Sequence, residues 1–153
     1  MALRDELTGV KNKHAYSMAE EELRTKVASG LVKKYAFIVF DLNGLKYVND
    51  TYGHKIGDEF IKKGCQIICE AFSHSPVYRI GGDEFVVIAQ GKDLARIDFA
   101  LNLVEAKNHE NRVKGEVTIA FGMARGDGAT SVNDVFELAD ANMYTKKKQM
   151  KRE

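Results

Sequence analysis

The chain has 153 residues, 44% of them apolar and 29% charged, a balance typical of one globular domain with a single core. A formal net charge of +1 gives no reason to expect nucleic acid as a partner, or direct contact of this chain with a membrane. No apolar run approaches the roughly 18–20 residues that span a bilayer, and the start lacks a signal-peptide core. We therefore expect a soluble, cytoplasmic domain.

The first half of the chain combines helical patterns with one strongly apolar strand. Residues 13–29 predict a helix that ends at Gly30. The continuous apolar run 35–40 predicts a strand buried on both faces. A short helix over 45–51 and a longer one over 57–72 follow. The apolar stripe expected on the longer helix consists of Ile56, Phe60, Gly64, Ile67, Ile68 and Ala71.

The second half predicts a hairpin, two helices and a further strand. Strands over 77–80 and 85–89 form the hairpin, followed by a helix over 94–107, a strand over 117–121 and a helix over 131–148. This order predicts an α/β or α+β fold of the ferredoxin-like kind. In it a central mixed sheet carries helices over one or both faces.

The turn between the hairpin strands reads Gly81-Gly82-Asp83-Glu84. Glycine tolerates the positive φ angles of tight turns and allows another molecule to approach the backbone closely. Adjacent carboxylates beside such a turn repel each other and gain no packing, a cost that a bound cation would offset. The pattern favours a metal and phosphate site, with a solvated hairpin tip as the alternative.

Asp41 follows the buried strand directly. If that strand lies beside the hairpin, Asp41 reaches the sheet edge where Asp83 and Glu84 sit. Hard divalent cations such as Mg²⁺ take oxygen ligands, usually one or two carboxylates together with substrate phosphates. The three carboxylates supply such a set, and the Leu42 carbonyl is a possible fourth ligand.

The next residues, from Asn43 through Gly44 and Leu45 to Lys46, open a short helix. A glycine at a strand-to-helix turn exposes backbone N–H groups at the positive end of the helix, which suits a phosphate. The chain has no Walker sequence, so this turn is not a P-loop.

The two cysteines, Cys65 and Cys69, are four residues apart on a predicted helix. We interpret them as small core residues. A zinc site would need two further ligands at suitable spacing, and helical geometry in a reducing compartment disfavours a disulfide between them.

Several long motifs in one order resemble the GGDEF domains, the diguanylate cyclases, which join two GTP molecules into cyclic di-GMP. The motifs are DELTGVKN at 5–12, FDLNGLKYVND at 40–50, YGH at 52–54, GD at 57–58, RIGGDEF at 79–85, AD at 139–140, MY at 143–144 and Lys147. The resemblance implies one GGDEF domain over residues 1–153, excised from a larger sensor protein that could be membrane-anchored.

The resemblance also implies roles for individual residues. Mg²⁺, or Mn²⁺ in its place, would bind Asp41, the Leu42 carbonyl, Asp83 and Glu84, and the last two would be catalytic. The residues implied in substrate binding are Gly44, Leu45, Lys147 and Lys151 for the phosphates and Asn49, Asp58 and nearby His54 for guanine. Guanine offers N–H donors to a carboxylate where adenine presents a bare acceptor, so the site is expected to reject ATP.

Other interpretations of these residues stay open. His54 would cap the preceding helix, Asn49 and Asp58 would satisfy helix termini, and the two lysines would belong to a solvated basic tail, 146–152. Two neighbours are expected outside the site: Lys46 paired with an acid, and Arg79 orienting the hairpin.

The family also implies partners and alternatives. Because the product has two-fold symmetry and one domain binds one GTP, two copies must meet as half-sites, brought together by an upstream sensor domain. Many members carry an Arg-x-x-Asp product-inhibition motif where this chain has residues 72–75, Phe-Ser-His-Ser, so we expect no feedback binding there. A silent GTP-binding domain and a cyclase making other dinucleotides are the competing functions.

Overall fold

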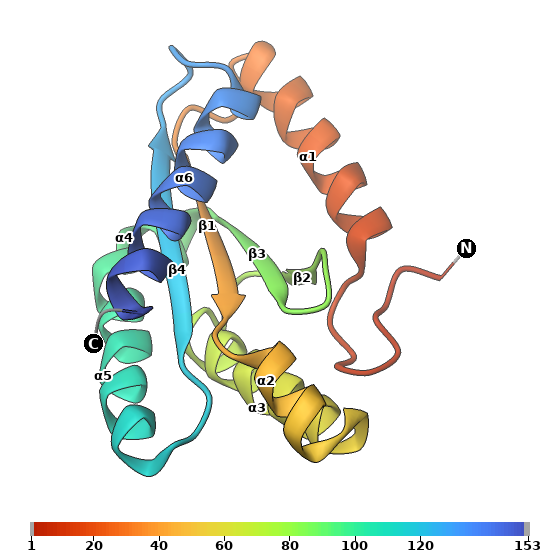
Figure 1. The fold of residues 1–153 in the computed structure, drawn as a ribbon. Coiled ribbons are helices and arrows are strands. Elements are labelled where there is room, and N and C mark those ends of the chain that lie inside the picture. Colours follow the sequence, from red (N-terminus) through yellow and green to blue (C-terminus); the bar gives the residue numbers. More distant parts are fainter. Residues whose placement is uncertain (1, 152–153) are drawn as a thin grey trace.

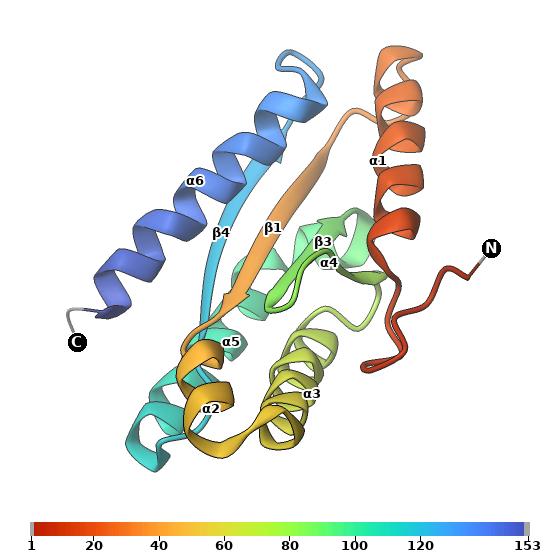
Figure 2. The same ribbon diagram turned by 45° about the vertical axis from the view of Figure 1, so that its right-hand side comes forward.

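In the computed structural model, which describes residues 2–151, one sheet lies between two layers of helices (Figures 1 and 2). Helices α1 (Lys13–Ala28) and α6 (Val132–Lys151) cover one face, and α3 (His54–Ala71) and α5 (Ile97–Lys114) cover the other. The short helices are α2 (Leu45–Tyr52) and α4 (Gly91–Ala95). Among the described residues, no helix has the length and apolarity needed to cross a bilayer.

Within residues 2–151 the sheet has four strands in the order β2-β3-β1-β4. They are β1 (Tyr35–Leu42), β2 (Val77–Arg79), β3 (Glu84–Ala89) and β4 (Ile119–Gly126). The predicted α+β class is confirmed, but each pairing of neighbouring strands is antiparallel, so the sheet is not mixed. β2 does run in the direction of β1, yet β3 lies between them.

Strand β1 is the centre of two hydrophobic cores. All eight of its residues are buried, which confirms the prediction of a strand covered on both faces. Phe37 and Val39 pack toward α1 and α6, whereas Ile38 and Phe40 pack toward α3 and α5. Because successive side chains alternate between faces, the next residue, Asp41, points to the α6 side.

The long helix predicted over 57–72 differs from the observed one. α3 begins at His54, three residues before the expected start, because one residue, Gly53 with φ 90°, separates it from α2. Ile56 is 50% exposed, so its predicted place in the core is wrong. The buried residues of α3 are Gly57, Ile61, Gly64, Cys65 and Ile68.

α5 continues to Lys114, seven residues beyond the expected end at 107. Its last two turns bury Asn108 and Asn111, whose side-chain amides donate to the Ile119 and Val117 carbonyls at 2.8 Å. These asparagines interrupt the apolar period of the sequence while satisfying the backbone where β4 begins.

Two glycines allow helices to approach the sheet closely. A Cβ atom on Gly122 of β4 would collide with the backbone of α6 at Ala139 and Met143. On the opposite face, a Cβ on Gly64 of α3 would lie 2.6 and 2.8 Å from the methyl groups of Leu42. The end of β1 is thus held between α3 and α6.

Replacing Gly122 with alanine is expected to destabilise the fold by about 1–3 kcal/mol, because rigid backbone atoms must move to admit the new methyl group. Urea denaturation measures this free energy. Gly82→Ala is the matched control, since a Cβ there meets nothing within 4 Å. Equal stability of the two variants would contradict the close packing of α6 on β4.

Candidate metal and phosphate site

Three carboxylates converge where β1 ends. Asp41 lies opposite Glu84 in the β1–β3 register, and Asp83 directly precedes β3. One oxygen from each carboxylate lies within 4.8 Å of the others, and in residues 2–151 this is the single such group of three potential metal ligands. The Leu42 N–H donates to the Asp83 carbonyl at 2.9 Å, which ties the turn to the end of β1.

Asp41 is the buried member of this group, with 4% of its surface exposed. Burial raises the pKa of its carboxyl, while Lys147 lowers it by donating to Oδ2 at 2.9 Å. The other oxygen, Oδ1, is buried and has no hydrogen-bond partner among the described residues. A buried carboxylate oxygen without a partner is costly, and a divalent cation would satisfy it.

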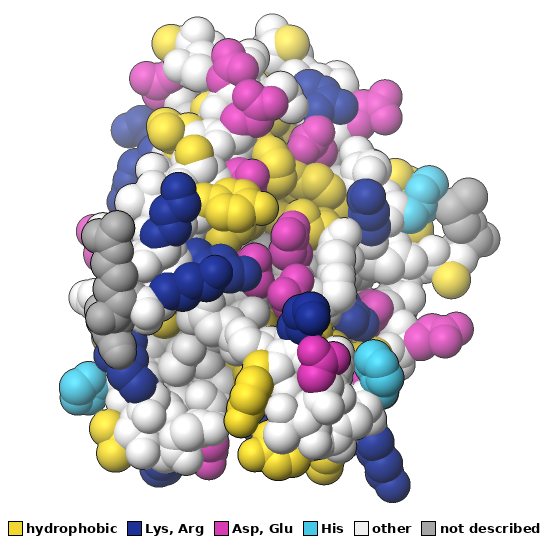
Figure 3. Space-filling model, in the orientation of Figure 1, with side chains coloured by type: hydrophobic (Ala, Val, Ile, Leu, Met, Phe, Trp, Pro, Cys, Tyr) yellow, Lys and Arg dark blue, Asp and Glu magenta, His cyan; other side chains and the backbone are white. Residues whose placement is uncertain are grey.

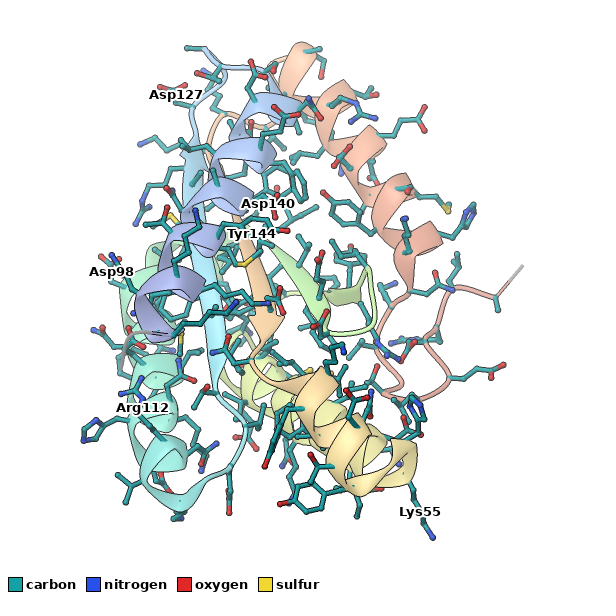
Figure 4. The ribbon with its side chains drawn as sticks, viewed as in Figure 1. Lys55, Asp98, Arg112, Asp127, Asp140 and Tyr144 are labelled. Atoms are coloured by element: carbon teal, nitrogen blue, oxygen red, sulfur yellow. The ribbon has the colours of Figure 1, made fainter. Side chains whose placement is uncertain are left out.

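Glu84 is half-buried, and its surroundings also favour a cation. Burial raises the pKa of Glu84, and the negative charges of Asp83 and Asp140 raise it further. Asp140 lies on the part of α6 that faces the site (Figure 4). Like charges opposite each other on paired strands are destabilising, so the donor set fits a hard divalent ion.

The turn glycines do not have the conformation expected for them. Gly81 and Gly82 are absent from the glycines with positive φ, so the first of the two reasons expected for a glycine there is wrong. A Cβ on Gly82 would meet nothing within 4 Å, and one on Gly81 would make only ordinary contact with Glu84. Neither backbone strain nor packing among the described residues requires these glycines. Close approach by another molecule, the other reason expected from the sequence, stays a prediction.

Arg79 holds the turn in place, as the sequence predicts. Its guanidinium donates to the Gly82 carbonyl at 2.8 Å and to the Gly81 carbonyl at 3.2 Å. The same group binds both carboxylate oxygens of Asp5 at 3.2 Å, and Asp5 accepts from Thr8. The turn is therefore tied to the N-terminal segment.

A cavity of about 300 Å³ lies beside the carboxylates, between the start of α2 and the end of α6. Its lining residues are Asn43, Gly44, Arg112, Thr118, Lys147, Met150 and Lys151. Figure 3 shows acidic side chains in the middle of this face and basic ones beside them. The structure thus brings together three predicted phosphate-binding residues, Gly44, Lys147 and Lys151.

The turn into α2 has the backbone geometry expected for an anion-binding site. Gly44 has φ 84° and precedes the first helical residue, Leu45, whose side chain packs against the core. Asn43 steadies the turn by donating from its side chain to Thr118 Oγ1 at 3.0 Å. Backbone N–H groups at the start of α2 lie at the positive end of the helix dipole.

Sequence reasoning missed Arg112 and Thr118 in this cavity. Arg112 lies on α5, more than 60 residues away from Gly44 in sequence (Figure 4). No local motif marks either residue, so only the packing of α5 and α6 around β4 reveals them.

The candidate guanine-binding residues form a separate group where α2 meets α3. Asn49 is half-buried, and its Oδ1 lies directly against Gly57, where any Cβ would collide with it. Asp58 follows Gly57 on α3 and is exposed. His54 is exposed and begins α3, and it does not line the phosphate cavity.

Contacts at α2 test two expectations from the sequence, capping of this helix by His54 and pairing of Lys46 with an acid. The Gly53 N–H closes this helix by donating to the Asn49 carbonyl at 2.9 Å, so the cap lies one residue before His54. Lys46 pairs with Asp50 at 3.4 Å on the exposed surface, as expected.

An acidic cluster beside a cation-lined cavity is typical of domains that bind a metal ion together with a phosphorylated ligand. A family model described as "Diguanylate cyclase, GGDEF domain" matches residues 2–153. The chain belongs to the GGDEF family.

Curated relatives carry the same description. The chain is 37% identical over 150 residues to the diguanylate cyclase DgcS of Shewanella oneidensis, covering 95% of this chain and 50% of DgcS. It is 31% identical over 156 residues to the probable diguanylate cyclase DgcT of Escherichia coli, covering 96% of this chain and 34% of DgcT. The chain thus spans half or less of these relatives.

Solved structures confirm the fold. The FimX GGDEF domain from Pseudomonas aeruginosa has a TM-score of 0.81 at 18% identity, covering 97% of this chain and 96% of that one. The GGDEF domain of DgcB from Caulobacter crescentus, in complex with c-di-GMP, has a TM-score of 0.78 at 24% identity, covering 97% and 92%.

Replacing Lys147 with glutamine is expected to destabilise the metal-free protein by about 1–3 kcal/mol, because buried Asp41 loses its cation. Urea denaturation in the presence of a chelator measures the loss. The exposed neighbour Lys148→Gln is the matched control, with an expected change within about 0.5 kcal/mol.

The double variant Asp41→Asn/Lys147→Gln completes a double-mutant cycle. The two changes are expected to be strongly non-additive, since the second removes the charge that the first leaves unpaired. Additive losses would show that the ion pair contributes nothing to stability.

Proposed function

We propose that this chain is a diguanylate cyclase, which converts two GTP molecules into cyclic di-GMP and two pyrophosphates. In each half of the reaction, the 3′-hydroxyl of one GTP attacks the α-phosphorus of the other. The bond from α-phosphorus to pyrophosphate breaks as the new O3′–P bond forms. The observation that carries this proposal is the acidic cluster beside the cation-lined cavity, in a member of the GGDEF family.

The proposed metal ligands are Asp41, Asp83, Glu84 and the Leu42 carbonyl. Bound Mg²⁺, or Mn²⁺ in its place, would supply positive charge for the triphosphate and polarise its oxygens. The unpartnered Oδ1 of Asp41 supports this assignment. Lys147 pairs with Asp41 in this structure. If Asp41 bound a metal ion instead, Lys147 would be free to pair with the phosphates.

The other residues bind and orient the nucleotide. The amides of Gly44 and Leu45 and the ammonium groups of Lys147 and Lys151 hold the phosphates in the cavity. Asp83, or a water molecule that it holds, accepts the proton of the attacking hydroxyl.

The guanine base is recognised by residues located where α2 meets α3. Asn49 and Asp58 bind the guanine edge, and His54 lies beside them. A carboxylate paired with guanine N–H groups would be left unpaired opposite adenine, so the site favours GTP over ATP.

The proposal makes each domain half of an active site. A single GTP-binding face cannot join two nucleotides, so a second copy must bring its own GTP opposite the first. In this scheme residues 1–153 act as one cytoplasmic GGDEF domain, and a sensor domain elsewhere in the parent protein pairs two copies. Met1 and residues 152–153 lie outside the described residues.

Incubation with GTP and Mg²⁺ over a wide range of protein concentration tests this function, with chromatographic detection of cyclic di-GMP and pyrophosphate. The rate is expected to rise faster than linearly with protein, because two half-sites must meet. Glu84→Ala is expected to lower the rate by at least about 100-fold. No product from two tethered copies that still bind GTP would favour a silent GTP-binding domain.

Replacing Asp58 with serine is expected to reduce the preference for GTP over ATP by about 10-fold or more, because the carboxylate that reads guanine is lost. Competitive binding of the two nucleotides measures the preference. Glu59→Ser, at the next position on α3, is the matched control. An unchanged preference in Asp58→Ser would remove Asp58 from base recognition and reopen the cyclase for other dinucleotides.

A further inference from the structure

Cys65 and Cys69 form a thiol pair on α3 that is not part of the group of three carboxylates. They lie one turn apart on α3, both as free thiols, with their Sγ atoms 4.0 Å from each other. Cys65 is 4% exposed and belongs to the core, whereas Cys69 is half-buried. The proposed cyclase reaction uses neither of them.

Cys69 borders a cavity of about 240 Å³ between the N-terminal segment and the connection from α3 to β2. The lining residues are Arg4, Val10, Lys11, Cys69, Phe72, Ser73, Ser75, Pro76 and Val77. Cys65 is not among them. Cys69 thus borders the same cavity as two basic residues, Arg4 and Lys11, and the Arg4 guanidinium also donates to the Gly9 carbonyl at 3.2 Å.

The contact between the two thiols shifts their pKa values in opposite directions. Hydrogen bonding from Cys65 holds the pKa of Cys69 below its usual value, although burial and the nearby Glu70 act against this. The same interaction, together with burial, raises the pKa of Cys65, and the charge of Asp5 adds to that effect. Since the thiolate is the nucleophile, Cys69 is the reactive member of the pair.

We propose that Cys69 is a modification site for small disulfides that carry carboxylate groups. The Cys69 thiolate attacks one sulfur of the disulfide R–S–S–R, and a bond forms between Sγ and that sulfur. The bond between the two reagent sulfurs breaks, and R–S⁻ leaves and takes a proton from water. Arg4 and Lys11 bind the carboxylates of the group retained on Cys69.

The geometry of α3 keeps the reaction at this mixed disulfide. A bond between the two cysteines needs Cβ atoms about 3.5–4.5 Å apart, whereas residues one helical turn apart have Cβ atoms about 5–6 Å apart. Cys65 is therefore not expected to displace the adduct, and its role in the proposal is limited to the Sγ–Sγ contact with Cys69.

The test is to incubate the full chain with oxidised glutathione, an acidic disulfide, and to locate adducts by intact mass and peptide mapping. One adduct per chain is expected, on Cys69, forming at least about threefold faster than on an unfolded peptide of residues 62–72. Cys69→Ser removes the adduct, and Cys65→Ala, which removes the hydrogen-bonding thiol, slows its formation at neutral pH.

Charge recognition is tested by comparing oxidised glutathione with cystamine, a cationic disulfide. For each reagent, the rate of adduct formation on the full chain is divided by its rate on the unfolded peptide of residues 62–72. Oxidised glutathione is expected to be favoured over cystamine, and Lys11→Gln is expected to reduce this preference. Lys63→Gln, an exposed lysine on α3, leaves it unchanged.

Three results would overturn the proposal: first reaction at Cys65, a rate at Cys69 no higher than in the peptide, or no preference for the acidic disulfide. Circular dichroism and thermal melting confirm that each variant is folded. Adduct formation needs no nucleotide turnover, so its failure would leave the proposed cyclase function untouched.

Discussion

The buried carboxylate of Asp41 is the constraint around which the site is organised. An acidic group with 4% exposure is stable in the fold only with a compensating charge, and α6 provides that charge through Lys147. The same carboxylate lies opposite Glu84 and close to Asp83. Lys147 acts on all three acids, and Lys13 also lowers the pKa of Glu84. Without a metal ion, the negative charges of these carboxylates exceed the positive charge beside them. Such an excess of negative charge favours binding of a cation.

Several contacts far apart in sequence keep the surroundings of Asp41 rigid. Arg79 fixes the turn that carries Asp83, and Asn43 fixes the turn into α2 through Thr118. Lys146 pairs with Glu105 of α5, which anchors the end of α6 beside the phosphate cavity. Each contact joins an element of the candidate site to a different part of the fold.

The sequence predicts the elements well where the apolar pattern is unbroken. The run from Tyr35 to Phe40 indicates a strand buried on both faces, and the structure confirms it. The end of α5 is missed because buried Asn108 and Asn111 look like surface residues until their bonds to β4 are known. Ile56 is misplaced because the buried stripe of α3 begins at the next residue, Gly57, and continues through Ile61 and Gly64.

Some residues of the candidate site can likewise be predicted from the sequence, and others cannot. The convergence of Asp41, Asp83 and Glu84 can be predicted because strand pairing alone brings them together. Arg112 and the pairing of Lys147 with Asp41 cannot, because both depend on how whole helices pack on the sheet. The glycine motif is recognised correctly, but the reason first assigned to it, a positive φ, does not hold.

The close approach of two helices at Gly64 and Gly122 has a consequence for how sequence variation in this chain should be interpreted. These glycines set the spacing between the sheet and the helices on either side of it, and neither belongs to the acidic motif. In a deep mutational scan both would score as intolerant as the proposed metal ligands, although their role is packing. A map of intolerant positions would thus outline the close packing around β1 as well as the proposed site.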